Sequence, residues 1–138
     1  MIKTPITKKS SDKKDDWALL KIGLIAIAVL LIAAFFVNAY FVEKKKRAES
    51  NCGRMESDAN NTLAAISSYF AIPEHTNLPT YDLLVEKENL ITTFPVQIEG
   101  DPLGEIIVTV IGPSDDECPK GKKYVAYMGG TIAAEWQD

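Results

Sequence analysis

The sequence contains few of the side chains on which enzyme active sites and metal sites are usually built. Its 138 residues include one histidine and two cysteines. His75 lies between two prolines and has no G-x-S-x-G or comparable nucleophile motif beside it, so we expect a solvated loop residue. Two cysteines cannot form a zinc site by themselves, and the glycines are not spaced as a phosphate-binding loop. We therefore expect no enzyme activity, no catalytic residue, no cofactor or metal site, and no small-molecule substrate.

One stretch lacks both proline and side chains that are charged at neutral pH, and it is the longest apolar run in the chain. This run, Ile22 to Val42, has 21 residues, which at about 1.5 Å per helical residue span roughly 32 Å. The hydrocarbon core of a bilayer is about 30 Å thick. The alternative, a buried helix of a soluble domain, needs more chain around it than 138 residues offer. With Trp17 and Tyr40 as interfacial aromatic residues, the sequence predicts one transmembrane helix over residues 17–43.

Charge is distributed unevenly on the two sides of this run. Residues 1–16 are polar and lack apolar periodicity, which predicts a disordered tail. With the orientation given at the end of this section, this tail is cytoplasmic. Residues 1–21 contain six lysines and three aspartates, whereas residues 48–138 contain five basic and fifteen acidic residues. An acidic domain argues against a nucleic-acid partner. We expect the basic cluster Lys44–Arg47 to hold the helix at the lipid headgroups by snorkelling, in preference to a specific lipid site.

The helix is expected to continue beyond the membrane because no proline occurs between Trp17 and Pro73. Apolar residues recur there at spacings of three and four, which places them on one helical face. We expect this face to pack on a sheet, in preference to a cofactor site or an oligomer seam. Gly53 is a weak point for a kink or short break, since an interior glycine costs about 1 kcal/mol relative to alanine. The predicted packing residues are Met55, Ala59, Leu63, Ile66 and Phe70, preceded by Cys52, and the opposite polar face carries Glu49, Glu56, Asp58, Asn60, Asn61 and Ser67.

Beyond Pro73 the pattern changes to short elements separated by turn residues. Proline removes a ladder hydrogen bond, and β-branched residues favour strands. The expected elements are a helical turn starting at Thr80 or Asp82, an edge strand or extended connection within 91–98, a buried strand at 105–111, and two strands at 122–128 and 131–136 joined by a tight Gly129-Gly130 turn. Residues 44–138 are thus predicted to form one α+β domain, in which the long N-terminal helix packs on an antiparallel sheet of three or four strands.

The two cysteines and one acidic loop leave alternatives open. Cys52 and Cys118 either form a disulfide in an exported domain or remain two thiols in a reducing compartment. If bonded, they close a loop of 66 residues, which contributes about 4 kcal/mol in the loop-entropy model. Asp115, Asp116 and Glu117 have the oxygen ligands that Ca²⁺ prefers, but three consecutive acidic residues more often form a solvated turn. We therefore expect no bound ion.

The order of these elements resembles that of type IV pilins and pseudopilins, and the resemblance covers most of the chain. Residues 58–70 followed by 78–80 look like the end of the pilin helix, and residues 108–110 and 127–132 look like its sheet. The resemblance implies a non-enzymatic structural or assembly subunit of a type IV pilus or type II secretion system. Its partners would be membrane lipid and other such subunits, engaged through the N-terminal helix. It also implies an inner (cytoplasmic) membrane location, with the N-terminus cytoplasmic and the acidic domain periplasmic or extracellular.

Pilins are cut after a glycine that follows a basic leader, and they carry a glutamate five residues into the mature chain. Here Gly23 corresponds to that glycine and Leu24 to the first mature residue, whereas Ala28 stands at the glutamate position. The family's glutamate neutralises a neighbouring subunit's terminal amine in an apolar filament core, where an unpaired charge is costly. An alternative therefore stays open, namely a membrane-anchored extracytoplasmic binding or regulatory module with a pilin-like fold that does not polymerise.

Overall fold

A computed structural model describes residues 12–138 of the chain, and its side chains from Trp17 onwards. The chain divides into two compact units, Met1–Val42 and Glu43–Asp138. The elements are α1 (Asp12–Phe70), α2 (Tyr81–Glu88), β1 (Val96–Gly100), β2 (Ile106–Ile111), β3 (Lys123–Met128) and β4 (Ala134–Gln137). Of the tail predicted for residues 1–16, residues 1–11 lie outside the described residues. Helix α1 begins at Asp12, before the predicted start near Trp17.

Helix α1 is continuous over 59 residues and has no break at Gly53. Gly53 is exposed, and nothing lies within 4 Å of the position that its Cβ would occupy. Its neighbours on the other face, Cys52 and Met55, are buried in the core. Packing on both sides of the glycine therefore outweighs its intrinsic cost of about 1 kcal/mol.

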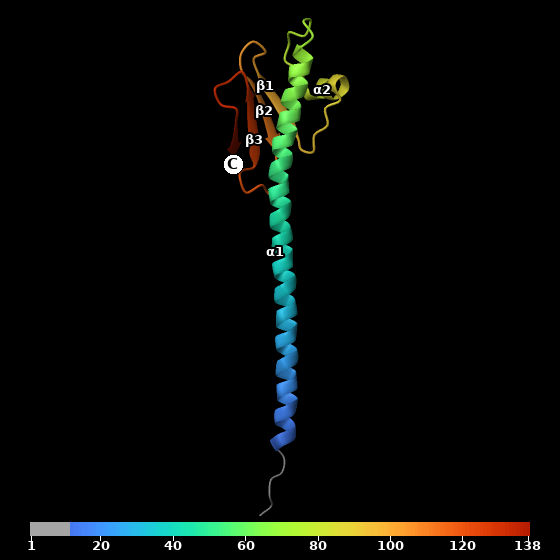
Figure 1. The fold of residues 1–138 in the computed structure, drawn as a ribbon, viewed down its shortest axis with the longest axis vertical. Coiled ribbons are helices and arrows are strands. Elements are labelled where there is room, and N and C mark those ends of the chain that lie inside the picture. The colour runs from blue at the N-terminus through green and yellow to red at the C-terminus, as the bar shows by residue number, and fades with distance from the viewer. Residues whose placement is uncertain (1–11) are drawn as a thin grey trace, which may run out of the picture. The chain divides into compact units, whose positions relative to one another are not determined.

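In the second unit, residues 52–70 of α1 pack against a sheet of four antiparallel strands in the order β1-β2-β3-β4 (Figure 1). Each strand pairs with the next in sequence. Val108 of β2 lies opposite Ile98 of β1 and Ala126 of β3, and Ala126 lies opposite Ala134 of β4. This is the predicted α+β fold, with a long apolar helix and a small antiparallel sheet.

The core of the second unit lies between α1 and one face of the sheet. In β2, Ile106, Val108 and Val110 are buried and alternate with half-buried residues, as expected for a strand with one face on a core. Helix α2 adds Leu84, which is fully buried. The largest fully buried side chains are Met55, Thr62, Ile66, Leu84, Val108 and Val110.

The short helix α2 is fixed by residues at both of its ends. Of the two predicted starts, Thr80 is the N-cap, and its Oγ1 accepts a hydrogen bond from the backbone N–H of Leu83 at 3.3 Å. At the other end Asn89 adopts a left-handed conformation with φ 53°, and its N–H donates to the carbonyl of Leu84. The chain leaves α2 at this residue and runs on to β1.

Two strand predictions need correction at their ends. Strand β1 begins at Val96, directly after Pro95, and is an edge strand as predicted. The predicted two-residue turn at Gly129-Gly130 is wrong, because residues 129–133 separate β3 from β4. Gly129 has φ +84°, and a Cβ there would lie 2.7 Å from the carbonyl oxygen of Gly104. The glycine pair thus allows close approach to the β1–β2 turn instead of forming a minimal hairpin.

Candidate functional site

The apolar part of α1 is the most conspicuous surface of the first unit. Every side chain from Trp17 to Val42 is exposed. Within the described residues, one helix is long and apolar enough to cross a membrane. At its N-terminal end, Lys21 Nζ lies 3.6 Å from the centroid of the Trp17 ring, a cation–π contact. These features are consistent with single-pass anchoring.

The residues of the predicted cleavage site both lie within this helix. Gly23 and Leu24 are exposed, and nothing lies within 4 Å of the position that a Cβ would take at Gly23. Ala28 is exposed on the same helix. Processing between Gly23 and Leu24 stays a prediction.

The predicted packing residues of α1 lie on the side that faces the sheet, but the buried face is rotated relative to the prediction. Met55, Ala59 and Ile66 are fully buried. Leu63 and Phe70 are only half-buried and lie at the border of the core. The buried face is completed by Asp58, Thr62, Ala65 and Tyr69.

Asp58, which is predicted to lie on the polar face of the helix, is instead buried and only 4% exposed. Its Oδ2 accepts hydrogen bonds from the backbone N–H groups of Thr93 and Phe94, at 2.8 and 2.9 Å. Its own backbone carbonyl accepts a hydrogen bond from the hydroxyl of Thr62, at 2.7 Å. A buried carboxylate with charge-assisted bonds of this kind is a structural tie between α1 and the segment before β1.

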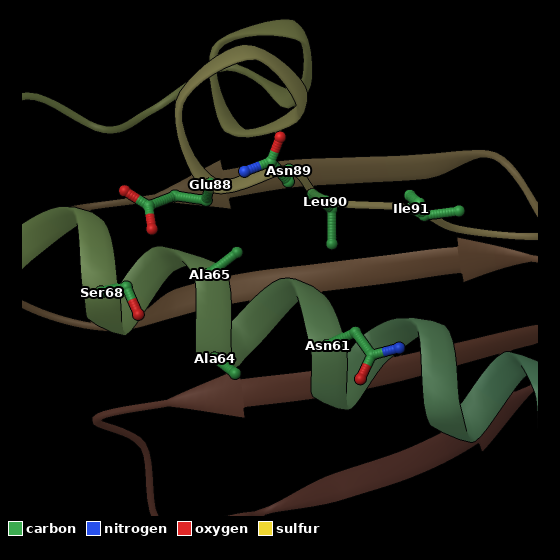
Figure 2. A pocket seen from close by; sticks show the side chains of 8 residues that line it. All are labelled: Asn61, Ala64, Ala65, Ser68, Glu88, Asn89, Leu90 and Ile91. Carbon is green, nitrogen blue, oxygen red and sulfur yellow. The ribbon is translucent and has the colours of Figure 1, made fainter.

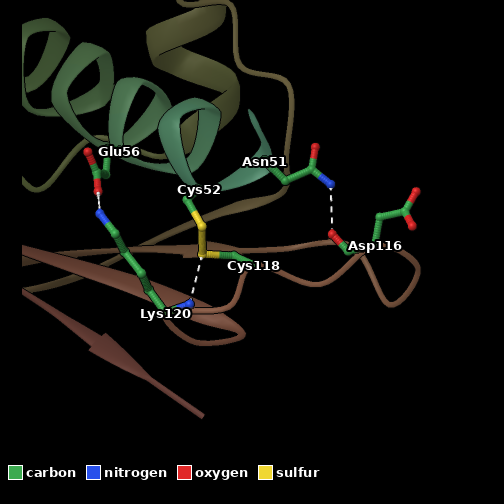
Figure 3. Close-up of a disulfide and its surroundings, with 6 residues drawn as sticks. All are labelled: Asn51, Cys52, Glu56, Asp116, Cys118 and Lys120. Atoms are coloured by element: carbon green, nitrogen blue, oxygen red, sulfur yellow. Dashed lines mark hydrogen bonds and ion pairs between the residues drawn. A yellow bond between two sulfur atoms is a disulfide. The ribbon is translucent and has the colours of Figure 1, made fainter. Parts of the chain in front are cut away.

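The structure joins Cys52 and Cys118 in a disulfide, with their Cα atoms 5.1 Å apart (Figure 3). The sequence left open a disulfide or two free thiols, and the structure has the disulfide. Around the bridge, Asn51 Nδ2 donates to the carbonyl of Asp116 at 3.0 Å, and Lys120 Nζ pairs with Glu56 at 2.9 Å. These contacts and the bridge fix the β2–β3 loop on α1.

Beside this attachment, α1 and the β2–β3 loop enclose a cleft of about 310 Å³. Four of its lining residues come from consecutive turns of α1, and Asp116 comes from the loop. Arg47 also forms an ion pair with Glu43. The cleft is lined by Arg47, Ser50, Asn51, Arg54 and Asp116.

A second cleft, of about 390 Å³, lies between α1 and the segment that follows α2 (Figure 2). Its lining mixes polar side chains with small and branched apolar ones. Ile91 on its rim is 83% exposed. The residues that line it are Asn61, Ala64, Ala65, Ser68, Glu88, Asn89, Leu90 and Ile91.

His75 has a structural environment that the sequence did not indicate. It is half-buried, and its ring stacks on Tyr69 with the ring centroids 4.0 Å apart and the planes 14° apart. Its Nδ1 lies 2.9 Å from the backbone carbonyl oxygen of Tyr69. These contacts correct the expectation of a solvated side chain and give His75 a role in holding the chain at the end of α1.

The outer face of the sheet carries a hydrogen-bonded pair of titratable groups, Tyr127 and Glu135. The phenol of Tyr127 donates to Glu135 Oε1 at 2.8 Å, and Gln137 Nε2 donates to the same oxygen at 2.7 Å. These bonds lower the pKa of Glu135 below its ordinary 4.5, and the bond to Glu135 raises the pKa of Tyr127 above 10.0. Elsewhere in residues 12–138, no group of three or more His, Cys, Asp or Glu side chains is placed to hold a metal ion.

The sequence contains a signal for the burial of Asp58. Asp58 follows Met55 by three positions and precedes Thr62 by four, so it fits the buried face as well as the apolar residues do. A carboxylate is nevertheless expected to face solvent, because its burial without hydrogen-bond partners is costly. The cleft lined by Arg47 and Arg54 depends on the path of the β2–β3 loop, which the helical pattern of the sequence does not specify.

No protein-family model, curated protein or solved structure matches this chain.

Proposed function

We propose that this protein is a non-enzymatic pilin-like subunit, with a structural or assembly role in a type IV pilus or type II secretion system. The observation that supports this most is the continuity of α1 from Asp12 to Phe70. One helix supplies both the apolar segment and the residues that pack on the sheet. In a filament or its membrane-embedded precursor, such a helix carries lateral contacts between subunits while the domain is displayed outside.

The disulfide supports the orientation that we propose for the domain. Disulfides persist in oxidising compartments and are rare in the cytosol. The Cys52–Cys118 bridge therefore favours a periplasmic or extracellular location for residues 43–138, with the N-terminus in the cytoplasm and the apolar segment in the inner membrane.

The apolar segment has the composition needed for close helix association. Transmembrane helices pack mainly through small residues, because lipid tails and apolar side chains are equivalent surroundings. The small residues that we propose as contact positions are Gly23, Ala26, Ala33 and Ala34.

One observation favours the second candidate, an anchored binding or regulatory module with this fold that does not polymerise. Ala28 lacks the carboxylate that would neutralise a neighbouring subunit's terminal amine, and Leu24 is not followed by a compensating acid before Glu43. An unpaired amine in an apolar filament core is strongly unfavourable. A permanently anchored chain that keeps its basic leader has no such amine to neutralise.

Intact-mass analysis of the protein extracted from its native membrane separates these two candidates. A mature chain that starts at Leu24 supports processing and incorporation into a filament, and Gly23→Leu should then abolish the cleavage. Gly53→Ala is a matched control, because Gly53 is the other exposed glycine in α1 and lies outside the leader. A chain that retains Met1 favours the permanent anchor.

Lateral association is tested by single cysteines introduced along residues 26–37. Because Cys52 and Cys118 are bonded to each other, each new thiol is the only free one among the residues that the structure describes. Crosslinked dimers that recur every three or four positions would support a defined helix interface. Uniform or absent crosslinking, together with a retained Met1, would contradict the subunit role.

A further inference from the structure

We propose that the cleft formed by Arg47, Ser50, Asn51, Arg54 and Asp116 binds a phosphate group. The proposal does not depend on whether the chain joins a filament, because all five residues lie in the second unit. Two sources supply this chemistry, a lipid headgroup and free phosphate, and the experiment below distinguishes them.

The helical spacing of the four α1 residues places their side chains together. Arg47 and Arg54 are seven positions apart, which is about two turns, so they lie on the same face. Ser50 and Asn51 lie between them on that face, one turn from each arginine. The cleft is therefore lined by two arginines, with Ser50 and Asn51 between them in the sequence. Hydrogen-bond donors in this arrangement fit the oxygens of a phosphate.

The loop side of the cleft is held in place before any ligand binds. Asn51 Nδ2 donates to the carbonyl of Asp116, and the next residue of α1, Cys52, is bonded to Cys118 of the same loop (Figure 3). Asp116 itself adopts a left-handed conformation with φ +56°. A wall fixed covalently and by hydrogen bonding has little freedom left to lose on binding, which favours affinity.

Arg54 is the residue on which recognition mainly depends. It is exposed and forms no ion pair or hydrogen bond with any residue in the part of the chain that the structure describes. Its planar guanidinium can make two parallel hydrogen bonds to a phosphate, which a lysine cannot. Arg47 adds a second positive charge, partly offset by its ion pair with Glu43.

The surroundings favour an anion of single charge. Residues 43–54 contain five basic and two acidic residues, in contrast to the acidic remainder of the domain. Asp116 places a carboxylate at the cleft, which penalises a dianion more than the monoanionic phosphodiester of a lipid. Arg47 also follows the apolar run by only five positions in the sequence. A phospholipid headgroup is therefore the source that we favour.

The test uses the full chain in a neutral detergent and measures binding by thermal stabilisation and native mass spectrometry. The probes are phosphatidylglycerol, diacylglycerol with the same acyl chains but no phosphate, and inorganic phosphate. We expect phosphatidylglycerol to bind and diacylglycerol not to bind. Binding of inorganic phosphate with the same dependence on Arg54 would support the same site with a soluble ligand.

Three variants distinguish a specific binding site from general electrostatic attraction to the basic residues. Arg54→Gln should weaken phosphatidylglycerol binding about tenfold, since it removes a bidentate charged contact. Lys46→Gln makes the same change in net charge but lies about 100° around the helix from Arg47 and does not line the cleft, so it should change binding less than about twofold. Asp116→Asn should strengthen binding, because it removes the one carboxylate that lines the cleft.

The same comparison can overturn the proposal. Equal losses for Arg54→Gln and Lys46→Gln would show diffuse attraction to the basic cluster. Equal binding of diacylglycerol and phosphatidylglycerol, or no binding of either phosphate probe, would also exclude the site. The gain expected for Asp116→Asn cannot arise from misfolding, so it keeps the test decisive even if one loss-of-charge variant is unstable.

Discussion

The carboxylate of Asp58 accepts a hydrogen bond from the backbone N–H of Phe94, with Oδ2 and N 2.9 Å apart, although 36 positions separate the two residues. A second bond, from Thr93 at 2.8 Å, goes to the same oxygen. These residues directly precede Pro95 and β1, so Asp58 sets where the chain enters the sheet. A polar side chain in the middle of α1 thus performs a task that apolar packing cannot, because it satisfies two backbone donors.

We predict that Asp58→Ala destabilises the second unit by about 2–4 kcal/mol, because two part-buried backbone N–H groups lose their acceptor. For a unit of this size the midpoint of thermal unfolding should fall by about 10–20 °C. Near-UV circular dichroism of the full chain in detergent would measure it. Asp115→Ala is the matched control, since Asp115 is exposed and should change stability by less than about 0.5 kcal/mol. Equal midpoints for the two variants would contradict a structural role for Asp58.

The disulfide should contribute strongly because it closes a long loop. With a sequence separation of 66, the loop-entropy model assigns about 4 kcal/mol to the Cys52–Cys118 bridge. We expect reductant to lower the unfolding midpoint of the wild-type domain. Reductant should leave the Cys52→Ala/Cys118→Ala double variant unchanged. Free thiols detected by alkylation of the untreated protein would show that the bridge does not form in the cell.

The rotated buried face of α1 predicts a difference between two apolar residues that lie three positions apart. Ile66→Ala should cost about 2–5 kcal/mol, because Ile66 is fully buried among core residues. Leu63→Ala should cost less than about 1.5 kcal/mol, since Leu63 is half-buried and its site can be filled by solvent. Thermal unfolding of both variants gives the two costs, and a cost for Leu63→Ala as large as that for Ile66→Ala would support the face predicted from the sequence, which contains both residues.

The hydrogen bond between Tyr127 and Glu135 predicts that the domain loses stability at low pH through Glu135 and at high pH through Tyr127. Because the pKa of Glu135 is lowered in the folded state, its contribution to stability is present above its ordinary 4.5 and is lost as pH falls through the lowered value. The pKa of Tyr127 is raised, so its contribution is present below 10.0 and is lost as pH rises through the raised value.

An NMR titration of the Glu135 side-chain carboxyl carbon can test this pair directly. Tyr127→Phe should return the pKa of Glu135 towards 4.5. Gln137→Ala should have a smaller effect in the same direction, because the bond from Tyr127 is the larger cause of the shift. The opposite order would mean that Gln137 is the main partner of the carboxylate in solution.

Local patterns in the sequence predicted much of the fold. The strand at residues 105–111 was evident from its β-branched residues, and the structure has β2 at Ile106–Ile111. Thr80 was one of the two predicted starts of α2, and it is the N-cap because its hydroxyl satisfies a free N–H of the first turn. In both cases the cause of the structure lies within a few residues of the element itself.

The features that were missed depend on partners far away in the chain. Burial of Asp58 is compensated by N–H groups 35 and 36 positions later in the chain. The sequence next to Asp58 therefore does not show how much free energy its burial costs. The length of the β3–β4 connection follows from the close approach of Gly129 to Gly104, another contact between distant segments. The arginine cleft likewise needs the β2–β3 loop, whose position is fixed by Asn51 and the disulfide.

The covalent bridge between α1 and the β2–β3 loop also determines how the protein responds to proteolysis. A single cut at any peptide bond between residues 53 and 117, including the exposed segment after α1, leaves both fragments linked through Cys52 and Cys118. The nicked domain would stay attached to the apolar helix and to whatever membrane holds it. After a cut within this loop, separation of the two fragments would require reduction of the bridge as well.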